Sequence, residues 1–171
     1  MKKTILVLTT GGTIEKCYSE FEGSLLNRNT QLKERFLKKL RLPYADIQVQ
    51  ELMAKDSLQM NDEDRKYILT QVQKLQSGLE PIIILHGTDT METTARYIFE
   101  NLKEPKVAIV LTGAMKPIGF EDSDALQNFT EALMVSQVLA PGIYISFHGH
   151  LFHVPNVRKN LSKGTFERFD L

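Results

Sequence analysis

Short apolar runs alternate with amphipathic segments along almost the whole chain. The runs are rich in β-branched and aliphatic residues, as buried parallel strands are, and they occupy Thr4–Leu8, Ile47–Leu52, Pro81–His86, Val107–Thr112 and Gly142–Phe147. Segments of helical periodicity lie between them, at Gln31–Leu40, Asp62–Gln76, Met91–Leu102 and Ser123–Leu139. Strands that alternate with helices favour right-handed βαβ crossovers. The pattern therefore predicts an α/β fold: a doubly wound, mostly parallel sheet with helices on both faces.

The length of the chain and its uninterrupted alternation of strands and helices predict one domain. At 171 residues the chain has the usual size of a single domain, and no repeat, low-complexity tract or linker interrupts the pattern. We therefore expect residues 1–171 to form one three-layer α/β domain.

The tail from His148 to Leu171 leaves two interpretations open, an antiparallel hairpin or a path over the surface. In the helix predicted over 123–139, Leu126, Phe129 and Leu133 should share one face.

Charge and cysteine content restrict the partners and the compartment. The 21 basic residues balance the 21 acidic ones, and no block of one sign occurs, so neither nucleic acid nor a membrane is expected as a partner. A small charged substrate needs only local charges and remains compatible. The apolar run Thr4–Leu8 is too short for a secretory signal, and no stretch approaches a membrane span. Because Cys17 is the only cysteine, no internal disulfide can form, and we expect a cytoplasmic protein.

The first candidate site follows the first predicted strand, at Gly11-Gly12-Thr13. Paired glycines let the backbone approach a ligand closely and leave N–H groups free to bind an oxyanion. Thr13 then presents a hydroxyl at the carboxyl end of the strand, where open α/β sheets build their sites. An ordinary strand-to-loop turn explains the triplet about equally well. The sequence lacks both the Gly-x-Gly-x-x-Gly fingerprint of dinucleotide sites and a phosphate-binding Walker loop.

The second candidate site is the segment from His86 to Thr94, which follows another predicted strand. Thr88 and Asp89 lead directly into a helix, whose N-terminal N–H groups and positive dipole end favour a bound carboxylate. Helix capping is the alternative interpretation for both residues, and for Thr90 the N-cap role is preferred. A threonine hydroxyl is a poor nucleophile until a base or a charge activates it. The candidate activators in this chain are Lys159, Asp89 and Tyr18.

Together these motifs resemble those of the bacterial-type L-asparaginase family. One family motif matches residues 10–14, Thr-Gly-Gly-Thr-Ile, and another matches residues 86–92, His-Gly-Thr-Asp-Thr-Met-Glu. The resemblance extends over nearly the whole chain and implies the fold predicted above. The catalytic residues that it implies are Thr13 as the nucleophile, Thr88 as a second threonine, Asp89 as a substrate contact, Lys159 as the catalytic lysine, and Tyr18 as the tyrosine of a mobile loop.

The resemblance also implies a set of substrate-binding residues: Gly12, Ser57, Thr88 and Asp89. Ser57 lies in the segment 56–60, Asp-Ser-Leu-Gln-Met, which is similar to the one that holds the substrate carboxylate. Residues 113–117, with Asp124 and Asn128 after them, match a further structural signature. Two features depart from the family pattern. Leu58 stands where many members carry a glutamine, and we expect the usual second domain, which lends a glutamate to a neighbouring protomer, to be missing.

The activity implied by the resemblance is hydrolysis of L-asparagine to L-aspartate and ammonia. Thr13 would form a covalent acyl-enzyme, with no cofactor and no metal. Two alternatives stay open: a non-catalytic amino-acid-binding module, and an amidase acting on glutamine or another amide. A site without the second domain would be open to water, so we expect a homo-oligomer, a dimer or tetramer. Two candidates could cover the site: the loop around Tyr18 itself, and the tail of a neighbouring copy from His148 onward, which contains Phe152, His153, Phe166 and Phe169.

Three tail histidines, His148, His150 and His153, form an alternative metal site. His148 and His150 would share one face of a strand, and zinc binds such sets. No acidic residue lies nearby at ligand spacing, so polar packing or a contact between protomers is the preferred interpretation. Cys17 carries no sign of an activated thiol.

Overall fold

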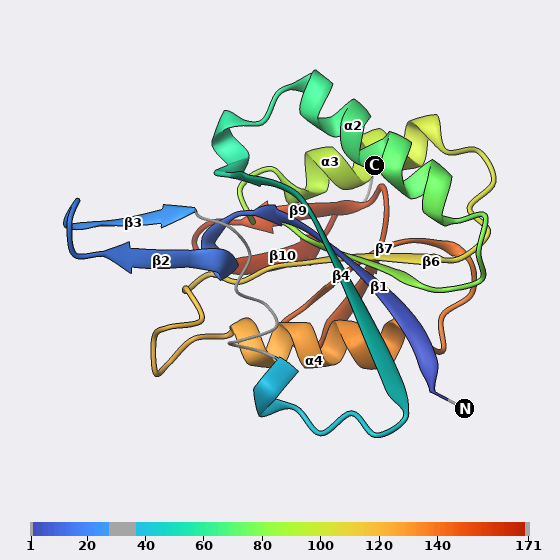
Figure 1. The fold of residues 1–171 in the computed structure, drawn as a ribbon. Helices are drawn as coiled ribbons and strands as arrows, with labels where there is room; N and C mark the ends of the chain where they lie inside the picture. The colour runs from blue at the N-terminus through green and yellow to red at the C-terminus, as the bar shows by residue number, and fades with distance from the viewer. Residues whose placement is uncertain (1, 28–36, 170–171) are drawn as a thin grey trace.

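A six-stranded sheet forms the centre of the protein (Figure 1). The computed structural model describes residues 2–27 and 37–169. The strand order is β4-β1-β5-β6-β7-β8, and the bounds are β1 (Lys3–Gly11), β4 (Ala45–Lys55), β5 (Ile82–Leu85), β6 (Ala108–Thr112), β7 (Gly142–Phe147) and β8 (His150–His153). Strand β8 is antiparallel to β7, and the other neighbours are parallel. The predicted α/β fold with a mostly parallel sheet is confirmed.

In the described part of the chain, three α-helices connect the strands: α2 (Asp62–Leu75), α3 (Met91–Asn101) and α4 (Ala125–Ser136). Helix α2 starts with a capping box, in which Asn61 and Asp64 each accept a hydrogen bond from the other's main-chain N–H. The helix predicted over Gln31–Leu40 lies largely outside the described residues, because only 37–40 belong to the described part. Of these, Leu37–Lys39 form a single 3-10 turn.

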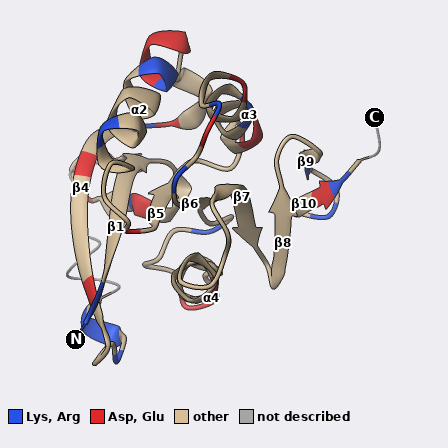
Figure 2. Ribbon diagram, turned by 90° about the vertical axis from the view of Figure 1, so that its right-hand side faces the viewer, with Lys and Arg blue, Asp and Glu red and all other residues tan. Residues whose placement is uncertain are grey.

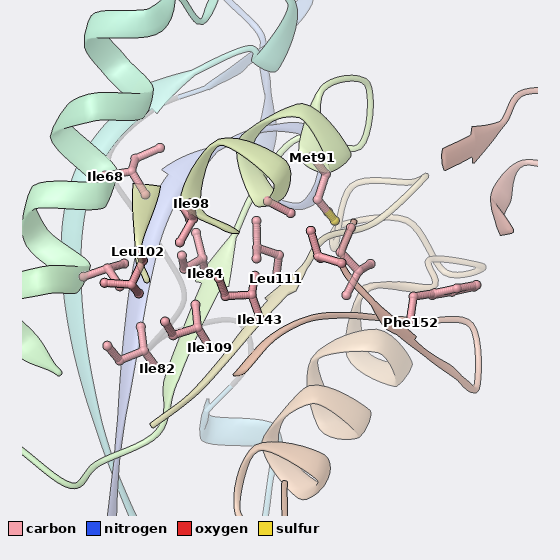
Figure 3. Packing of buried hydrophobic residues seen from close by; sticks show 14 of the residues in the cluster. Ile68, Ile82, Ile84, Met91, Ile98, Leu102, Ile109, Leu111, Ile143 and Phe152 are labelled. Atoms are coloured by element: carbon pink, nitrogen blue, oxygen red, sulfur yellow. The ribbon is translucent and has the colours of Figure 1, made fainter. Parts of the chain in front are cut away.

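The helices cover both faces of the sheet, as Figure 1 shows with α2 and α3 above and α4 below. Alternate residues of one strand point to opposite layers. Ile82 and Ile84 pack under α2 and α3, in the cluster drawn in Figure 3, whereas Ile83 and Leu85 pack against the α4 side. The burial of both sheet faces explains why these strands consist of continuous apolar runs.

The three residues predicted to share one face of α4 differ in burial. Leu126 is 36% exposed, whereas Phe129 and Leu133 are buried as expected. The buried row of this helix runs instead through Ala125, Phe129 and Ala132. Leu126 lies in the first turn of α4, after a loop whose residues 119–122 are exposed.

The chain after β7 forms an antiparallel hairpin, one of the two interpretations that the sequence left open. His148 and Gly149, with φ of 48° and 74°, make the tight turn from β7 into β8. Strands β9 (Val157–Asn160) and β10 (Thr165–Arg168) then pair as a separate two-stranded sheet. Phe152 and Phe166 are buried in the core, so they are not the surface expected to cover the site of a neighbouring copy.

A second small hairpin follows β1 and was not predicted. Strands β2 (Lys16–Ser19) and β3 (Ser24–Asn27) pair antiparallel and project away from the body of the molecule (Figure 1). Phe21 near its tip is 97% exposed. Strands of this length that do not pack on the core carry too little apolar alternation to be recognised from sequence.

Acidic and basic residues are interspersed along α2, α3 and the β9–β10 hairpin (Figure 2). This distribution agrees with the balanced charge of the whole sequence. Among the helices that the structure describes, none combines the length and apolar character needed to cross a membrane.

Candidate functional site

Two glycines bring the two sequence motifs into contact. Gly12 follows β1 and Gly87 follows β5, and these strands are neighbours in the sheet. A Cβ atom on Gly12 would lie 2.4 Å from Cα of Gly87, and the φ of Gly12 is +82°. Only glycine permits both this close approach and this conformation without strain. Because Thr13 and Thr88 directly follow the two glycines, the contact brings both threonines to the same edge of the sheet.

The N–H groups of the first glycine pair are occupied, contrary to the prediction. The main-chain N–H of Gly11 donates to the Glu15 carboxylate at 3.1 Å, and that of Gly12 donates to the carbonyl of Lys55 at 2.9 Å. These groups are therefore not free to bind an oxyanion. The glycines serve close packing of the backbone instead. Thr13 itself is half-buried at the start of a 3-10 turn, Thr13–Glu15.

Lys159 of β9 reaches both candidate residues of the second motif. Its Nζ donates to Thr88 Oγ1 at 2.8 Å and to Asp89 Oδ1 at 2.6 Å. The Lys159 side chain is only 12% exposed, and Thr88 is 3% exposed. The structure thus assembles the Thr88–Asp89–Lys159 cluster that the sequence predicted. Because the Thr88 oxygen accepts a bond from the ammonium group, its own proton is left to donate to another group.

Ser57 carries a buried hydroxyl without a hydrogen-bond partner in the described part of the chain. The residue is 1% exposed, and its Oγ finds no donor or acceptor there. A Cβ atom on Gly87 would lie 2.5 Å from this Oγ, so the hydroxyl borders the second motif directly. An unpaired buried hydroxyl costs stability, so its retention favours a role toward a ligand.

Thr90 occupies the N-cap position of α3, as predicted, but its side chain does not cap the helix. Its hydroxyl donates instead to the main-chain carbonyl of Ser57 at 2.9 Å. Asp56 supports the same turn by accepting a bond from the main-chain N–H of Leu58. These contacts fix the short Ser57–Gln59 turn against the second motif.

His86 is a structural residue of the site that sequence reasoning did not assign. It is fully buried, and burial lowers its pKa to about 4. The imidazole is therefore neutral: Nδ1–H donates to the carbonyl of Gly87 at 2.8 Å, and Nε2 accepts from the Thr94 hydroxyl at 2.8 Å. This bridge ties the turn after β5 to the first turns of α3. The indication in the sequence was the position of His86, directly before Gly87 in the second motif.

An ion pair links the β2–β3 hairpin to the Ser57 turn. Lys16 Nζ lies 2.7 Å from Asp56 Oδ2, and the hydrogen bond from Lys16 lowers the pKa of Asp56. Tyr18, two residues further along β2, is 65% exposed. Among the residues that the structure describes, no hydrogen bond joins Tyr18 to Thr13 or Lys159. The structure therefore does not bring the predicted loop tyrosine into the cluster.

Glu92 is a further contact of the cluster that was not predicted as part of the site. It lies in the first turn of α3, and its Oε2 accepts a hydrogen bond from the main-chain N–H of Lys159 at 3.1 Å. Burial raises the pKa of the Glu92 carboxyl group, against the lowering effect of that N–H donor.

Asp124 and Asn128 hold the loop after β6. Asp124 accepts hydrogen bonds from the main-chain N–H groups of Met115 and Lys116, and Asn128 donates to the carbonyl of Gly113. Burial raises the pKa of Asp124, but these donors and His148 outweigh it, so the net shift is downward. The signature residues thus have a structural role in shaping this loop.

The three tail histidines do not form a metal site. His148 lies in the turn before β8, where it contacts Asp124 and Thr165. His150 and His153, three apart on β8, point to opposite faces of the strand, where their rings contact those of Phe152 and Tyr144 respectively. Within residues 2–27 and 37–169, no group of three metal-ligating side chains comes together. His148 and His150 do not share a strand face, because the β7–β8 turn separates them.

Comparison with known proteins identifies a family for this chain. Residues 4–170 match the family model "Asparaginase, N-terminal". An L-asparaginase of Thermococcus kodakarensis is 32% identical over 161 residues, which are 94% of this chain and 48% of that protein. The solved thermostable L-asparaginase from that organism superposes with a TM-score of 0.85 at 29% identity, covering 98% of this chain and 52% of the other.

A second group of relatives carries another name. One component of the glutamyl-tRNA(Gln) amidotransferase of Methanococcus vannielii is 35% identical over 79 residues, which are 46% of this chain and 18% of that protein. The chain spans about half the length of the Thermococcus kodakarensis asparaginase and less of this amidotransferase component. Since the family model covers nearly every residue, the chain belongs to the asparaginase family and corresponds to its N-terminal domain.

Proposed function

We propose that this protein hydrolyses the side-chain amide of L-asparagine, giving L-aspartate and ammonia, with Thr13 as the nucleophile. The observation that carries the proposal is the double hydrogen bond of the Lys159 ammonium group to Thr88 and Asp89. A pure binding module has no need of two threonine hydroxyls and a buried lysine at one sheet edge. The relatives named L-asparaginase support the same assignment.

The proposed reaction has two steps on Thr13. The Thr13 Oγ attacks the amide carbon, and the C–N bond breaks as the nitrogen takes up the threonine proton and leaves as ammonia. Water then attacks the resulting ester, which releases aspartate and returns a proton to Thr13. Lys159, held by Asp89, polarises Thr88, whose free proton can be donated to the oxyanion or exchanged with the attacking water. No cofactor is required by these steps.

Further oxyanion donors are expected at the second motif rather than at the first. The N–H groups of Gly11 and Gly12 are already occupied. The N–H groups that lead into α3 belong to a helix N-terminus, where the first turn has no intrahelical partners. The amide oxygen of the substrate would therefore face Thr88 and the start of α3.

Recognition of the amino-acid part is assigned to Ser57 and Asp89. The orphaned Ser57 hydroxyl can donate to the α-carboxylate, and the Asp89 carboxylate, 38% exposed, can accept from the α-ammonium group. At Gly12 the main chain approaches Gly87 closely because no Cβ atom intervenes, and this leaves room beside Thr13. Tyr18 would join the site when the β2–β3 hairpin approaches the substrate.

Ammonia release from a panel of amides tests the proposal. We expect release from L-asparagine, with less from L-glutamine and none from D-asparagine or acetamide. L-glutamine is the alternative substrate to be compared first. Binding of amino acids without ammonia release would favour the non-catalytic module, and release from another amide alone would favour the different amidase.

We further propose that residues 1–171 act as one domain in a homo-oligomeric, cytoplasmic enzyme. Near the candidate site, the side chains of Tyr18, Phe21 and Leu58 are apolar and exposed. A second copy would cover them. Light scattering over a dilution series, run beside the activity assay, tests this. A monomer with full specific activity at the lowest concentration would contradict it.

A further inference from the structure

The hairpin that carries Lys159 is not part of the central sheet. Within the described residues, β9 and β10 pair only with each other, as a separate two-stranded sheet. Val157 and Phe166 anchor the hairpin in the core, with the Phe166 ring 5.0 Å from that of Phe147. Sheet hydrogen bonds therefore do not fix the distance from β9 to the second motif, and other contacts must set the position of Lys159.

The first turn of α3 and the loop before it hold Lys159 at both ends. Thr88 and Asp89 hold its ammonium group, and Glu92 holds its main-chain N–H at 3.1 Å. Glu92 and Lys159 are 67 residues apart in sequence. This contact is thus a tertiary connection between the helix of the motif and the strand that supplies the lysine.

We propose that Glu92 is a positioning residue, whose carboxylate fixes the backbone of Lys159 so that the ammonium group meets Thr88 and Asp89 together. The inference rests on the proposed function and deepens it. A lysine side chain has a flexible four-carbon stem, so its ammonium group is held in place only if the main chain is held too. A displacement of 1 Å in such a group can lower the rate by about a hundredfold.

The electrostatic surroundings of Glu92 agree with its role as a positioning residue. Glu92 is half-buried, and burial raises the pKa of its carboxyl group. The charged groups that act on it are Arg96 on the same helix and Lys159 on β9. Because the pKa is raised in the folded protein, ionisation of Glu92 costs stability, and this cost appears as the pH rises through that pKa. Replacement by glutamine removes the cost and keeps an acceptor oxygen.

Three variants separate positioning from a general effect on folding. Glu92→Ala removes the acceptor, and we expect kcat to fall about tenfold or more with KM within about twofold of the wild type. Glu92→Gln should retain kcat within about threefold at neutral pH, because its amide oxygen still accepts the bond. The matched control is Glu100→Ala, an exposed position on the same helix, which should leave kcat and KM unchanged.

A second readout does not depend on activity. In ¹⁵N-labelled protein the Lys159 main-chain amide resonance should follow the titration of Glu92 in the wild type and lose that transition in Glu92→Gln, while Glu100→Ala retains it. A wild type that releases no ammonia would refute the proposed function alone, and the amide titration would still decide the role of Glu92. The inference is overturned if Glu92→Ala of an active enzyme has an unchanged kcat. It is also overturned if the pH-dependent shift of the Lys159 amide resonance persists in Glu92→Gln.

Discussion

Lys159 Nζ lies 2.8 Å from Thr88 Oγ1, although 71 residues separate them in the chain. The same ammonium group lies 2.6 Å from Asp89 Oδ1. Charge-assisted hydrogen bonds of this length are stronger than those between neutral groups, and water has little access to a lysine that is 12% exposed. The side chains of Thr88, Asp89 and Lys159 therefore form one unit, and substitutions within it should not have independent effects.

Loss of two members of this unit should cost little more than loss of one. We expect Lys159→Met and Thr88→Val each to reduce kcat by about a hundredfold or more, and the double variant to be nearly the same, because residues that act together are non-additive. Steady-state kinetics of the three proteins measure this. Lys163→Met, at a lysine exposed on the same hairpin, is the control. Losses that multiply in the double variant would show that the residues act independently.

Replacement of Thr13 by alanine should abolish turnover and leave the fold intact. The covalent step needs the Thr13 oxygen, and losing a nucleophile removes several orders of magnitude of rate. The side chain is only half-buried, so thermal unfolding should change little. Thr93→Ala, exposed on α3, serves as the matched variant. More than about a tenth of wild-type turnover in Thr13→Ala would remove Thr13 as the nucleophile.

Ser57→Ala should weaken substrate binding without weakening the fold. A hydrogen bond to a charged group contributes about 1.5–3 kcal/mol, so KM should rise about tenfold or more. The hydroxyl has no partner in the described structure, and removing an unpaired buried polar group is neutral or stabilising. Kinetics and thermal melting of Ser57→Ala and of the exposed Ser77→Ala measure both effects. A lower melting temperature with unchanged KM would mean that Ser57 is only structural.

His86 should make the protein acid-sensitive. Its pKa is lowered from 6.5 to about 4 in the folded state, so the neutral ring contributes stability above pH 6.5, and this contribution is lost as the pH falls toward 4. The loss amounts to about 3 kcal/mol at 1.36 kcal/mol per pKa unit. Denaturant unfolding between pH 7.5 and 4 measures it. His86→Gln should show a flatter dependence and His150→Gln the wild-type one; equal slopes in all three proteins would contradict the assignment.

Local pattern was sufficient to identify the main strands, three helices and the two motifs. The run Ile82–Leu85 is apolar at every position because both of its faces are buried, and that requirement is visible without a structure. Helix α2 was recognisable from the helical periodicity of residues 62–76. The β2–β3 hairpin was not, because its strands do not pack on the core and have no apolar pattern to mark them.

The sequence by itself determined the residue types of the candidate site and the strand ends that carry them. Only the tertiary structure decided which polar groups pair there. Gly11 and Gly12 looked free to bind an oxyanion, but Glu15 and the distant Lys55 occupy their N–H groups. Glu92 looked like an ordinary helix residue until β9 came to lie against it. Hydrophobic periodicity is a local property, whereas a hydrogen bond depends on a few tenths of an ångström between segments that only folding brings together.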